Sequence, residues 1–351
     1  MTELKQLVEI SKYAGARWDW VQAGGGNVSV KTADGKMYIK ASGVCLADVS
    51  LTGGYAVLDH VKLLKAFGQI MRRPGKTKEL TEQKAALAMK ACQISATPSA
   101  SIETWLHAIL KKYTLHIHPV VINALVCRRD WKKVLRHLFA DIPYVAVAYK
   151  TPGIELALEL KEMLSKKSAT VIFLQNHGLV VSSDQKEQVI SLTEQVLARA
   201  EKFLGLDMSA YKLTNELSSV YNDVVGTDYI AYLCQDNALL QQAVKLAGID
   251  SVLFPDQVVY CGEKIVVIKK RLRETLGALC KRGAILPRVI IYKKRLFLMA
   301  PSLRKAREME EVLRAHVQVL QTLKSGQAHA LPRQELAYLT QWKAEKYRQK
   351  I

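Results

Sequence analysis

The sequence is poor in cysteine, in acidic residues relative to basic ones, and in long apolar segments. Its six cysteines are scattered through 351 residues and form no C-x-x-C pair, which argues against a disulfide framework and favours a reducing compartment. No apolar run approaches the roughly 18 residues that a membrane-spanning helix needs. The first 20 residues carry acidic side chains and lack the apolar core of an export signal. These absences predict a cytoplasmic protein without a membrane segment.

Basic residues dominate the charge of the chain. There are 51 Lys and Arg against 32 Asp and Glu, a net charge of +19, and such an excess attracts anions such as phosphorylated small molecules or nucleic acid. The basic residues are spread along the sequence, and no segment shows the interleaved aromatic residues or finger-type spacing of nucleic-acid-binding motifs. We therefore interpret the charge as a solvated basic surface and do not expect nucleic acid as a partner.

Hydrophobic periodicity divides the chain into two α/β regions. Alternation and glycine-rich turns predict a strand, a hairpin and a second strand over residues 27–40. A long amphipathic helix over residues 184–206 would close a first domain, which we place at residues 1–218. Residues 219–351 alternate short apolar runs with helical patterns and predict a smaller accessory α/β domain. In this domain a hairpin and a final helix are predicted at residues 288–301 and 332–350.

The segment LHIHP places His116 and His118 two positions apart, directly before a proline. Because the segment alternates polar and apolar residues, it predicts a strand, on which residues i and i+2 point to the same side. Both imidazoles can then converge on one metal ion. Taken alone the pair is weak evidence, and two ordinary polar contacts remain the competing interpretation.

Three further features strengthen the metal interpretation. His177 lies in QNHGL, a break within an apolar run, where an unpartnered histidine would be costly. Glu103 is expected in the first turn of the preceding helix, where a carboxylate interacts favourably with the helix dipole. The loops GGGN, KASG and PSAS are rich in small residues, which let backbone N–H groups approach a phosphate closely. Three neutral histidines with an open position and a nearby carboxylate indicate a catalytic metal site with acid–base function.

Six segments, in this order along residues 1–210, resemble the class II aldolase/adducin family. They are GGGNVSV (24–30), IKASGV (39–44), SIETWLHAIL (101–110), HIHP (116–119), YKTPG (149–153) and QNHGLVV (175–181). The resemblance implies a three-layer class II aldolase-like domain, in which helices flank a central, mostly antiparallel sheet. It also implies a homo-oligomer, a tetramer by analogy with the family.

Carried over residue by residue, the resemblance implies roles for the matching positions. His116, His118 and His177 would bind Zn²⁺ or another divalent ion such as Mn²⁺ or Co²⁺. Glu103 would be the acid–base residue. The substrate phosphate would lie against Gly26, Asn27, Ser42, Gly43 and Ser101.

The chain departs from the family at one position of the phosphate loop, where Ile102 stands in place of a second serine. Lys40 is a candidate compensating cation for that loss. His107, one helical turn after Glu103, either orients the site or is an ordinary hydrogen-bonded helix residue, and both interpretations stay open.

The resemblance implies cleavage of a phosphorylated ketose to dihydroxyacetone phosphate and an aldehyde through a metal-stabilised enediolate. The compact spacing between Glu103 and His116 looks most like the rhamnulose-phosphate aldolase portion of bifunctional aldolase–dehydrogenase proteins. Because the chain stops at Ile351, we expect no dehydrogenase activity. Two other functions stay open: a sugar-phosphate 4-epimerase, which uses the same bond cleavage without releasing fragments, and a non-catalytic adducin-like binding module.

Overall fold

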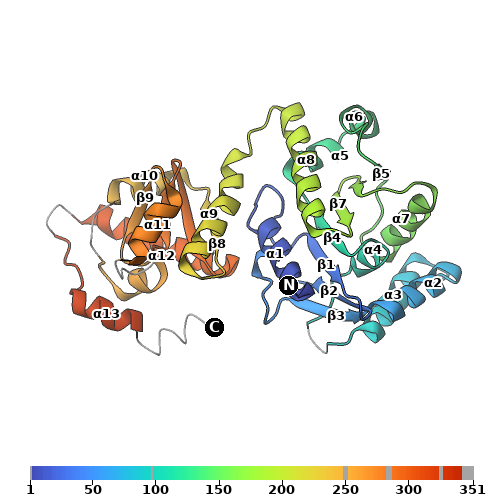
Figure 1. Cartoon of the computed structure of the whole chain (residues 1–351), viewed down its shortest axis with the longest axis horizontal. Coiled ribbons are helices and arrows are strands. Elements are labelled where there is room, and N and C mark those ends of the chain that lie inside the picture. Colours follow the sequence, from blue (N-terminus) through green and yellow to red (C-terminus); the bar gives the residue numbers. More distant parts are fainter. Residues whose placement is uncertain (1, 96–97, 248–251, 282–286, 324–326, 342–351) are drawn as a thin grey trace. The chain divides into compact units, whose positions relative to one another are not determined.

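The computed structural model divides the chain into two compact units, Met1–Met208 and Ser209–Ile351, each with its own sheet (Figure 1). The structure describes residues 2–95, 98–247, 252–281, 287–323 and 327–341. The domain boundary placed after residue 218 lies inside a helix of the second unit, α9 (Ser209–Val225).

The first unit is built on a seven-stranded sheet in the order β3-β2-β1-β4-β7-β6-β5. Its strands are β1 (Asn27–Lys31), β2 (Lys36–Lys40), β3 (Tyr55–Asp59), β4 (Tyr113–Ile117), β5 (Tyr144–Val147), β6 (Val171–Leu174) and β7 (Gly178–Ser183). Neighbouring strands are antiparallel except β5 and β6, which are parallel. The expected mostly antiparallel central sheet is therefore confirmed.

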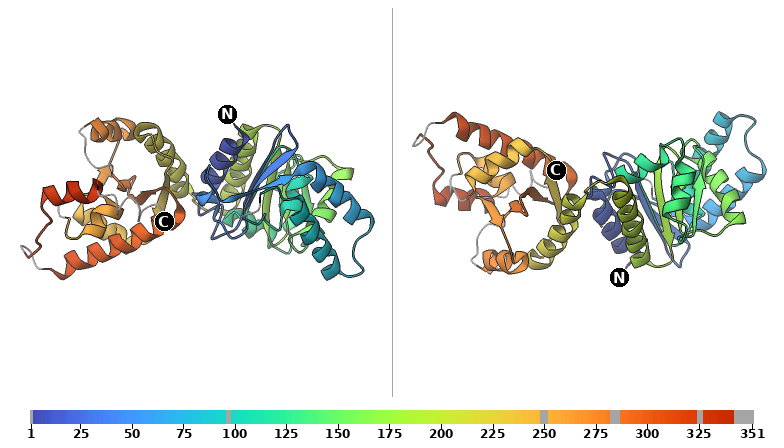
Figure 2. Two further views of the ribbon diagram at one scale, coloured as in Figure 1. Left: turned by 90° about the horizontal axis from the view of Figure 1, so that it is seen from below. Right: turned by 90° about the horizontal axis from the view of Figure 1, so that it is seen from above.

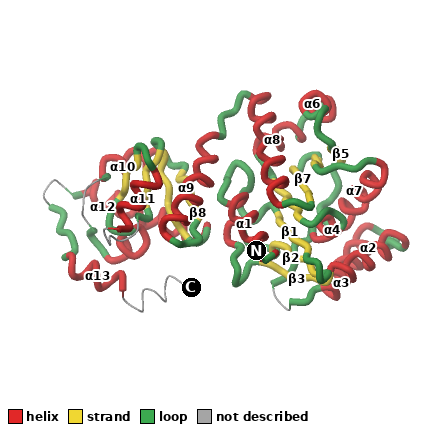
Figure 3. The backbone as a smooth tube through the Cα atoms, in the orientation of Figure 1, coloured by secondary structure: helices red, strands yellow, loops and turns green. Residues whose placement is uncertain are grey.

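Helices cover both faces of this sheet and complete three layers (Figures 2 and 3). They are α1 (Glu3–Gly15), α2 (His60–Arg72), α3 (Lys78–Cys92), α4 (Thr104–Ala108), α5 (Val120–Val126), α6 (Trp131–Leu138), α7 (Ile154–Lys166) and α8 (Lys186–Leu204). α1, α5, α6 and α8 share one apolar cluster with the sheet, and α2, α3, α4 and α7 share the other. In β6, Val171 and Phe173 join the first cluster while Ile172 and Leu174 join the second. A strand that is apolar on both faces requires cover on both faces.

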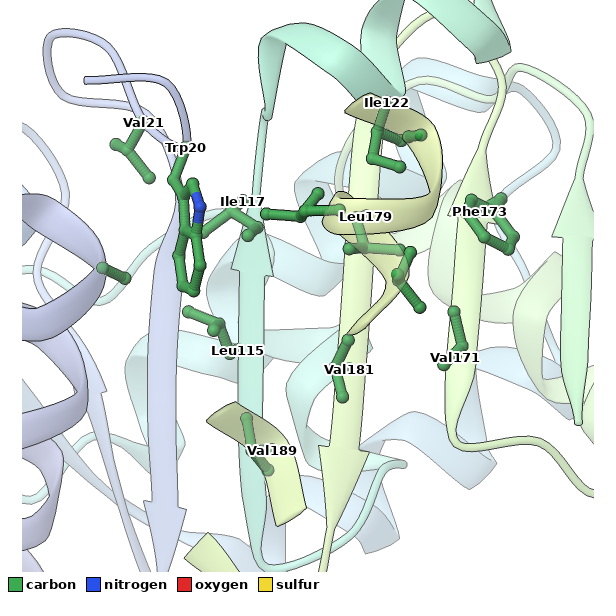
Figure 4. Packing of buried hydrophobic residues seen from close by; sticks show 14 of the residues in the cluster. Trp20, Val21, Leu115, Ile117, Ile122, Val171, Phe173, Leu179, Val181 and Val189 are labelled. Atoms are coloured by element: carbon green, nitrogen blue, oxygen red, sulfur yellow. The ribbon is translucent and has the colours of Figure 1, made fainter. Parts of the chain in front are cut away.

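The first cluster surrounds Trp20, which lies in the turn between α1 and β1 (Figure 4). The figure shows its ring beside Leu115 and Ile117 of β4, with Leu179 and Val181 of β7 beyond them. All five side chains are buried. Burial of the indole therefore holds this turn against the central strands.

A buried ion pair lies in the same turn. The Arg17 guanidinium donates to both carboxylate oxygens of Asp19, from Nε at 2.8 Å and from a terminal nitrogen at 2.6 Å. The backbone carbonyls of Asp19 and Trp20 in turn accept from the N–H groups of Val120 and His118, each at 3.0 Å. These backbone hydrogen bonds join the turn that contains the ion pair to the chain segment that follows β4.

The second unit has a four-stranded sheet in the order β8-β11-β10-β9. Its strands are β8 (Ile230–Cys234), β9 (Ile265–Ile268), β10 (Val289–Tyr292) and β11 (Arg295–Ala300), and its further helices are α10 (Asn237–Leu246), α11 (Leu272–Lys281), α12 (Leu303–Thr322) and α13 (Arg333–Gln341), with a π-helical turn at Gln257–Cys261. α9 and α11 pack on one face, and α10 and α12 on the other. The smaller α/β fold and the β10–β11 hairpin are confirmed.

The final helix predicted at residues 332–350 corresponds to α13, and its last nine positions lie outside the described residues. No helix in the described part of the chain is long and apolar enough to cross a membrane.

Replacing Arg17 by Met should lower the free energy of unfolding by about 3–5 kcal/mol, because it leaves the Asp19 charge buried without its partner. Urea denaturation followed by circular dichroism measures the change. Arg128→Met is the matched control, since the exposed Arg128–Asp130 pair has the same spacing and the same Nε–Oδ1 distance of 2.8 Å. This control should leave stability nearly unchanged. Equal losses in both variants would contradict the explanation.

Candidate active site

Two of the three predicted metal ligands come from the end of β4, at the centre of the sheet. His116 is fully buried, and its Nδ1–H donates to the Leu179 carbonyl at 3.0 Å. That hydrogen bond leaves Nε2 as the atom that can take a ligand. His118 follows β4 and is held through its backbone by Trp20. The third, His177, lies in the turn between β6 and β7, next to Asn176 with a positive φ of 53°.

The structure brings these three histidines together. One nitrogen of each lies within 4.8 Å of the others, and the Nε2 atoms of His116 and His118 are 3.0 Å apart. The ring centroids are separated by 4.8 to 5.0 Å. Three converging imidazole nitrogens fit one divalent cation, and this donor set is the one that catalytic zinc sites use.

Glycines on two loops let the backbone approach the His118 ring closely. A Cβ atom at Gly178 would lie 2.3 Å from the Ile117 carbonyl oxygen and 3.0 Å from Cδ2 of His118. A Cβ atom at Gly25 would lie 2.9 Å from Nδ1 of the same ring. The ring is therefore placed between two segments that tolerate no side chain. The glycines of GGGN and QNHGL thus also serve the histidines, a role that the sequence argument assigned to none of them.

Glu103 lies directly against the histidines. It is the N-cap residue of α4, one position before the expected first turn, and its N–H donates to the Ser101 hydroxyl at 3.3 Å. Its Oε2 atom is 3.3 Å from Nε2 of His116, and its Oε1 atom is 3.4 Å from Nε2 of His177. The Asn27 amide donates to Oε2 at 2.6 Å. Asn27, expected at the phosphate, therefore contacts the carboxylate.

Burial and charge together set the protonation of the site. Burial alone would raise the pKa of Glu103, but the imidazoles of His116 and His177 outweigh it, so this pKa lies well below its usual value. Burial would lower the pKa of His116, yet the Glu103 carboxylate raises it. For His118 and His177 burial dominates, reinforced by His116, and lowers the pKa to about 3 and to about 4. At neutral pH, Glu103 is ionised and these two histidines present uncharged lone pairs.

The three small-residue loops also lie together. The buried Lys40 ammonium donates to the carbonyls of Gly24 at 2.9 Å and Val44 at 2.7 Å, which joins GGGN to KASG. The Ser42 N–H donates to the Ser99 carbonyl at 3.0 Å, which joins KASG to PSAS. Lys40, expected as a compensating cation, therefore uses its donors to tie two loops together.

The remaining predicted phosphate contacts differ in accessibility. Ser42 and Gly43 are exposed, and Gly43 has a positive φ of 76°. Ser101 is buried below them, and Gly26 packs against the His116 carbonyl. Ile102, which stands where the family often has serine, is 59% exposed.

Fold and site together define a mostly antiparallel α/β domain whose buried histidine group could bind a metal ion. The family described as Class II Aldolase and Adducin N-terminal domain matches residues 5–203, and the chain belongs to this family. The resemblance at the level of the family is therefore confirmed.

Solved structures include similar domains. The N-terminal class II aldolase domain of a conserved protein from Thermoplasma acidophilum is 26% identical, with 58% of this chain and 94% of that chain covered and a TM-score of 0.50. YgbL from Klebsiella pneumoniae, a putative aldolase/epimerase/decarboxylase, is 19% identical, with 58% of this chain and 91% of that chain covered and a TM-score of 0.43. L-fuculose-1-phosphate aldolase from Thermus thermophilus is 20% identical, with 57% of this chain and 93% of that chain covered and a TM-score of 0.38. No curated protein matches the chain.

The pKa pattern predicts how metal affinity depends on pH, because protons compete with a cation for imidazole nitrogens. His116 has a raised pKa, whereas His177 takes a proton only near its pKa of about 4. As the pH falls from the raised pKa of His116 toward about pH 5, the logarithm of the Zn²⁺ affinity should therefore fall with a slope of about one. Competition with a chromophoric chelator measures the slope, and a value near three would contradict the assignment.

Proposed function

We propose that this protein is a metal-dependent class II aldolase that reversibly cleaves a phosphorylated ketose to dihydroxyacetone phosphate and an aldehyde. The observation that carries the proposal is the buried Glu103 carboxylate, whose oxygens lie 3.3 Å and 3.4 Å from two of three converging histidines. In a structural metal site the protein ligands fill every coordination position. A carboxylate that contacts the ligands without itself being a ligand would have no function there.

His116, His118 and His177 would hold Zn²⁺, or Mn²⁺ or Co²⁺ in its place. When bound, such an ion would stabilise the negative charge that develops on the enediolate oxygens of the three-carbon fragment. The Nδ1–H bond of His116 to the Leu179 carbonyl supports this role, because it turns Nε2 toward the other two rings.

Glu103 would act as the acid–base residue. In the direction of condensation it would remove a proton from C3 of dihydroxyacetone phosphate, and in the direction of cleavage it would return that proton to the same carbon. A general base must be ionised and within reach of the proton it takes. The lowered pKa of Glu103 supports the first condition, and the Asn27 amide orients its carboxylate.

The substrate phosphate would be held at the joined loops by Gly26, Asn27, Ser42, Gly43 and Ser101, with Lys40 fixing the loops behind them. The exposed Ser42 hydroxyl and the backbone around Gly43 support contact with an anion. Asn27 would contribute through its backbone, because its side chain is engaged with Glu103.

Further aspects of the proposal concern the whole chain. We place the activity closest to the rhamnulose-phosphate aldolase portion of bifunctional proteins, in residues 1–218, with 219–351 as an accessory domain. A homo-oligomer, a tetramer by analogy, is supported by exposed apolar side chains on α2 and α3. These are Val61, Leu64, Met71, Leu80 and Leu87. The six free cysteines support a cytoplasmic location.

A sugar-phosphate 4-epimerase remains the alternative within the family, because it would use the same carboxylate and cation. A non-catalytic binding module is disfavoured by the site itself. Burying a carboxylate and three imidazoles is costly, and a binding module gains nothing from that cost.

The purified protein should contain about one divalent ion per chain, since three converging imidazole nitrogens favour such a ligand. His116→Ala should lose the ion, whereas the matched control His137→Ala, an exposed histidine of α6, should retain it. Elemental analysis together with thermal unfolding measures both. Absence of metal in the native protein, with unchanged stability of His116→Ala, would overturn the enzyme proposal.

Glu103→Gln should bind the metal normally but lower kcat by about 10²- to 10⁴-fold, because the amide cannot accept the substrate proton. The assay is a panel of ketose phosphates, with dihydroxyacetone phosphate detected through a coupled NADH-dependent reduction. Inversion at C4 without release of dihydroxyacetone phosphate would identify the epimerase. Full activity of Glu103→Gln would remove this residue from the mechanism.

A further inference from the structure

Glu103 is carried by a helix too short to hold its own position. α4 has five residues, Thr104–Ala108, and a helix of this length has little stability of its own. The placement of the carboxylate must therefore come from whatever fixes α4 to the rest of the domain.

Strand β1 presents an unusual face to this helix. Asn27, Ser29 and Lys31 alternate along the strand and so point to one side, while Val28 and Val30 pack in the cluster on the opposite side. An alternating strand usually turns its polar face to solvent. Here the three polar residues are only 3%, 0% and 9% exposed.

Each of the three contacts a different point along α4. The Asn27 amide reaches Glu103 at the N-terminal end, 2.6 Å away. The Ser29 hydroxyl lies 2.8 Å from Nδ1 of His107. The Lys31 ammonium donates to the carbonyls of His107 at 2.8 Å and Lys111 at 2.6 Å, just where the helix ends. A cation at that end also interacts favourably with the helix dipole.

These polar contacts cost more free energy of burial than the packing of α4 alone would require. Within the described residues no carboxylate is at ion-pair distance from Lys31, and burial lowers its pKa to about 7. His107 is fully buried, burial lowers its pKa well below the usual value, and its Nε2 has no hydrogen-bond partner in the described structure. Apolar residues would cover the helix at lower cost. Directed hydrogen bonds, unlike apolar contacts, fix the rotation and the axial position of the helix.

We infer that Ser29, Lys31 and His107 are positioning residues, which together form a brace that holds Glu103 at the metal-binding histidines. The inference rests on the proposed function. The brace is built on β1, the strand that pairs with β4 at the metal site: Asn27 of β1 is the cross-strand partner of His116 in β4. The register between β1 and β4 therefore positions both the metal-binding residue His116 and α4, the helix that carries Glu103.

The test uses the full-length Zn²⁺ protein and three variants, Ser29→Ala, Lys31→Met and His107→Phe. Exchange of solvent deuterium into C3 of dihydroxyacetone phosphate, followed by NMR, reports the proton transfer alone. We expect this rate to fall by about 10- to 100-fold, as for a small misplacement of a reacting group. The Km for dihydroxyacetone phosphate and the Zn²⁺ affinity should stay within about twofold of wild type, because within the described residues none of the three brace residues is hydrogen-bonded to a metal-binding histidine or to a phosphate loop.

Amide hydrogen exchange provides a readout that does not depend on activity. Peptides covering residues 103–111 should lose protection in the variants, while peptides of β4 and β7 keep it. Thr193→Val is the matched control, since it removes a buried hydroxyl bonded to the Val189 carbonyl within α8. This control should keep the wild-type rate and protection. His107→Asn, which retains a hydrogen-bonding amide near the position of Nδ1, should recover part of the rate lost in His107→Phe.

Two outcomes decide against the brace. Unchanged deuterium exchange and unchanged protection in Ser29→Ala, which removes a single oxygen and is the variant least disturbing to folding, would overturn it. A parallel loss of Zn²⁺ affinity would show that the residues support the histidines instead. If wild type shows no deuterium exchange at all, the proposed function fails, and the protection of residues 103–111 alone then decides whether the brace exists.

Discussion

The buried negative charge of Glu103 is the constraint on which the arrangement of the first unit depends. A carboxylate removed from water must be compensated by hydrogen bonds or opposite charge. Here the compensation comes from Asn27 on β1, His116 on β4 and His177 in the β6–β7 turn. Four segments distant in sequence must therefore meet at one point.

The sheet order makes that meeting possible. β1, β4 and β7 are consecutive neighbours, with Asn27 opposite His116 and His116 opposite Val180. Both faces of these strands are covered by helices, so polar groups at their ends lie in a medium of low polarity. This environment explains why His118 and His177 are uncharged and why Glu103 and His116 shift each other's pKa in opposite directions. The three-layer arrangement of the first unit and the protonation of its histidines and Glu103 thus both follow from the same sheet topology.

The sequence was sufficient to predict the convergence but not every contact. His116 and His118 share a strand face by geometry and His177 interrupts an apolar run, but each feature alone is weak evidence, and the family resemblance was needed to join the three in a common site. Asn27 and Lys40 were expected at a phosphate, yet their donors are used by Glu103 and by two backbone carbonyls. Which acceptor a buried donor meets depends on tertiary packing, and local spacing carries no information about it. The polar alternation of β1 likewise gave no sign that its polar face would be buried, because a solvent-facing strand has the same pattern.

Two buried lysines on the strands beside the site, Lys31 of β1 and Lys40 of β2, direct their ammonium groups to the backbone. Lys31 and Lys40 are both buried, and both donate to pairs of backbone carbonyls. Burial lowers the pKa of each, to about 7 for Lys31. In the proposed function, recognition of the substrate phosphate at the joined loops would therefore depend mainly on hydroxyl and backbone N–H donors. Such donors select geometry more than charge, which would suit a site whose cation is supplied by a metal ion.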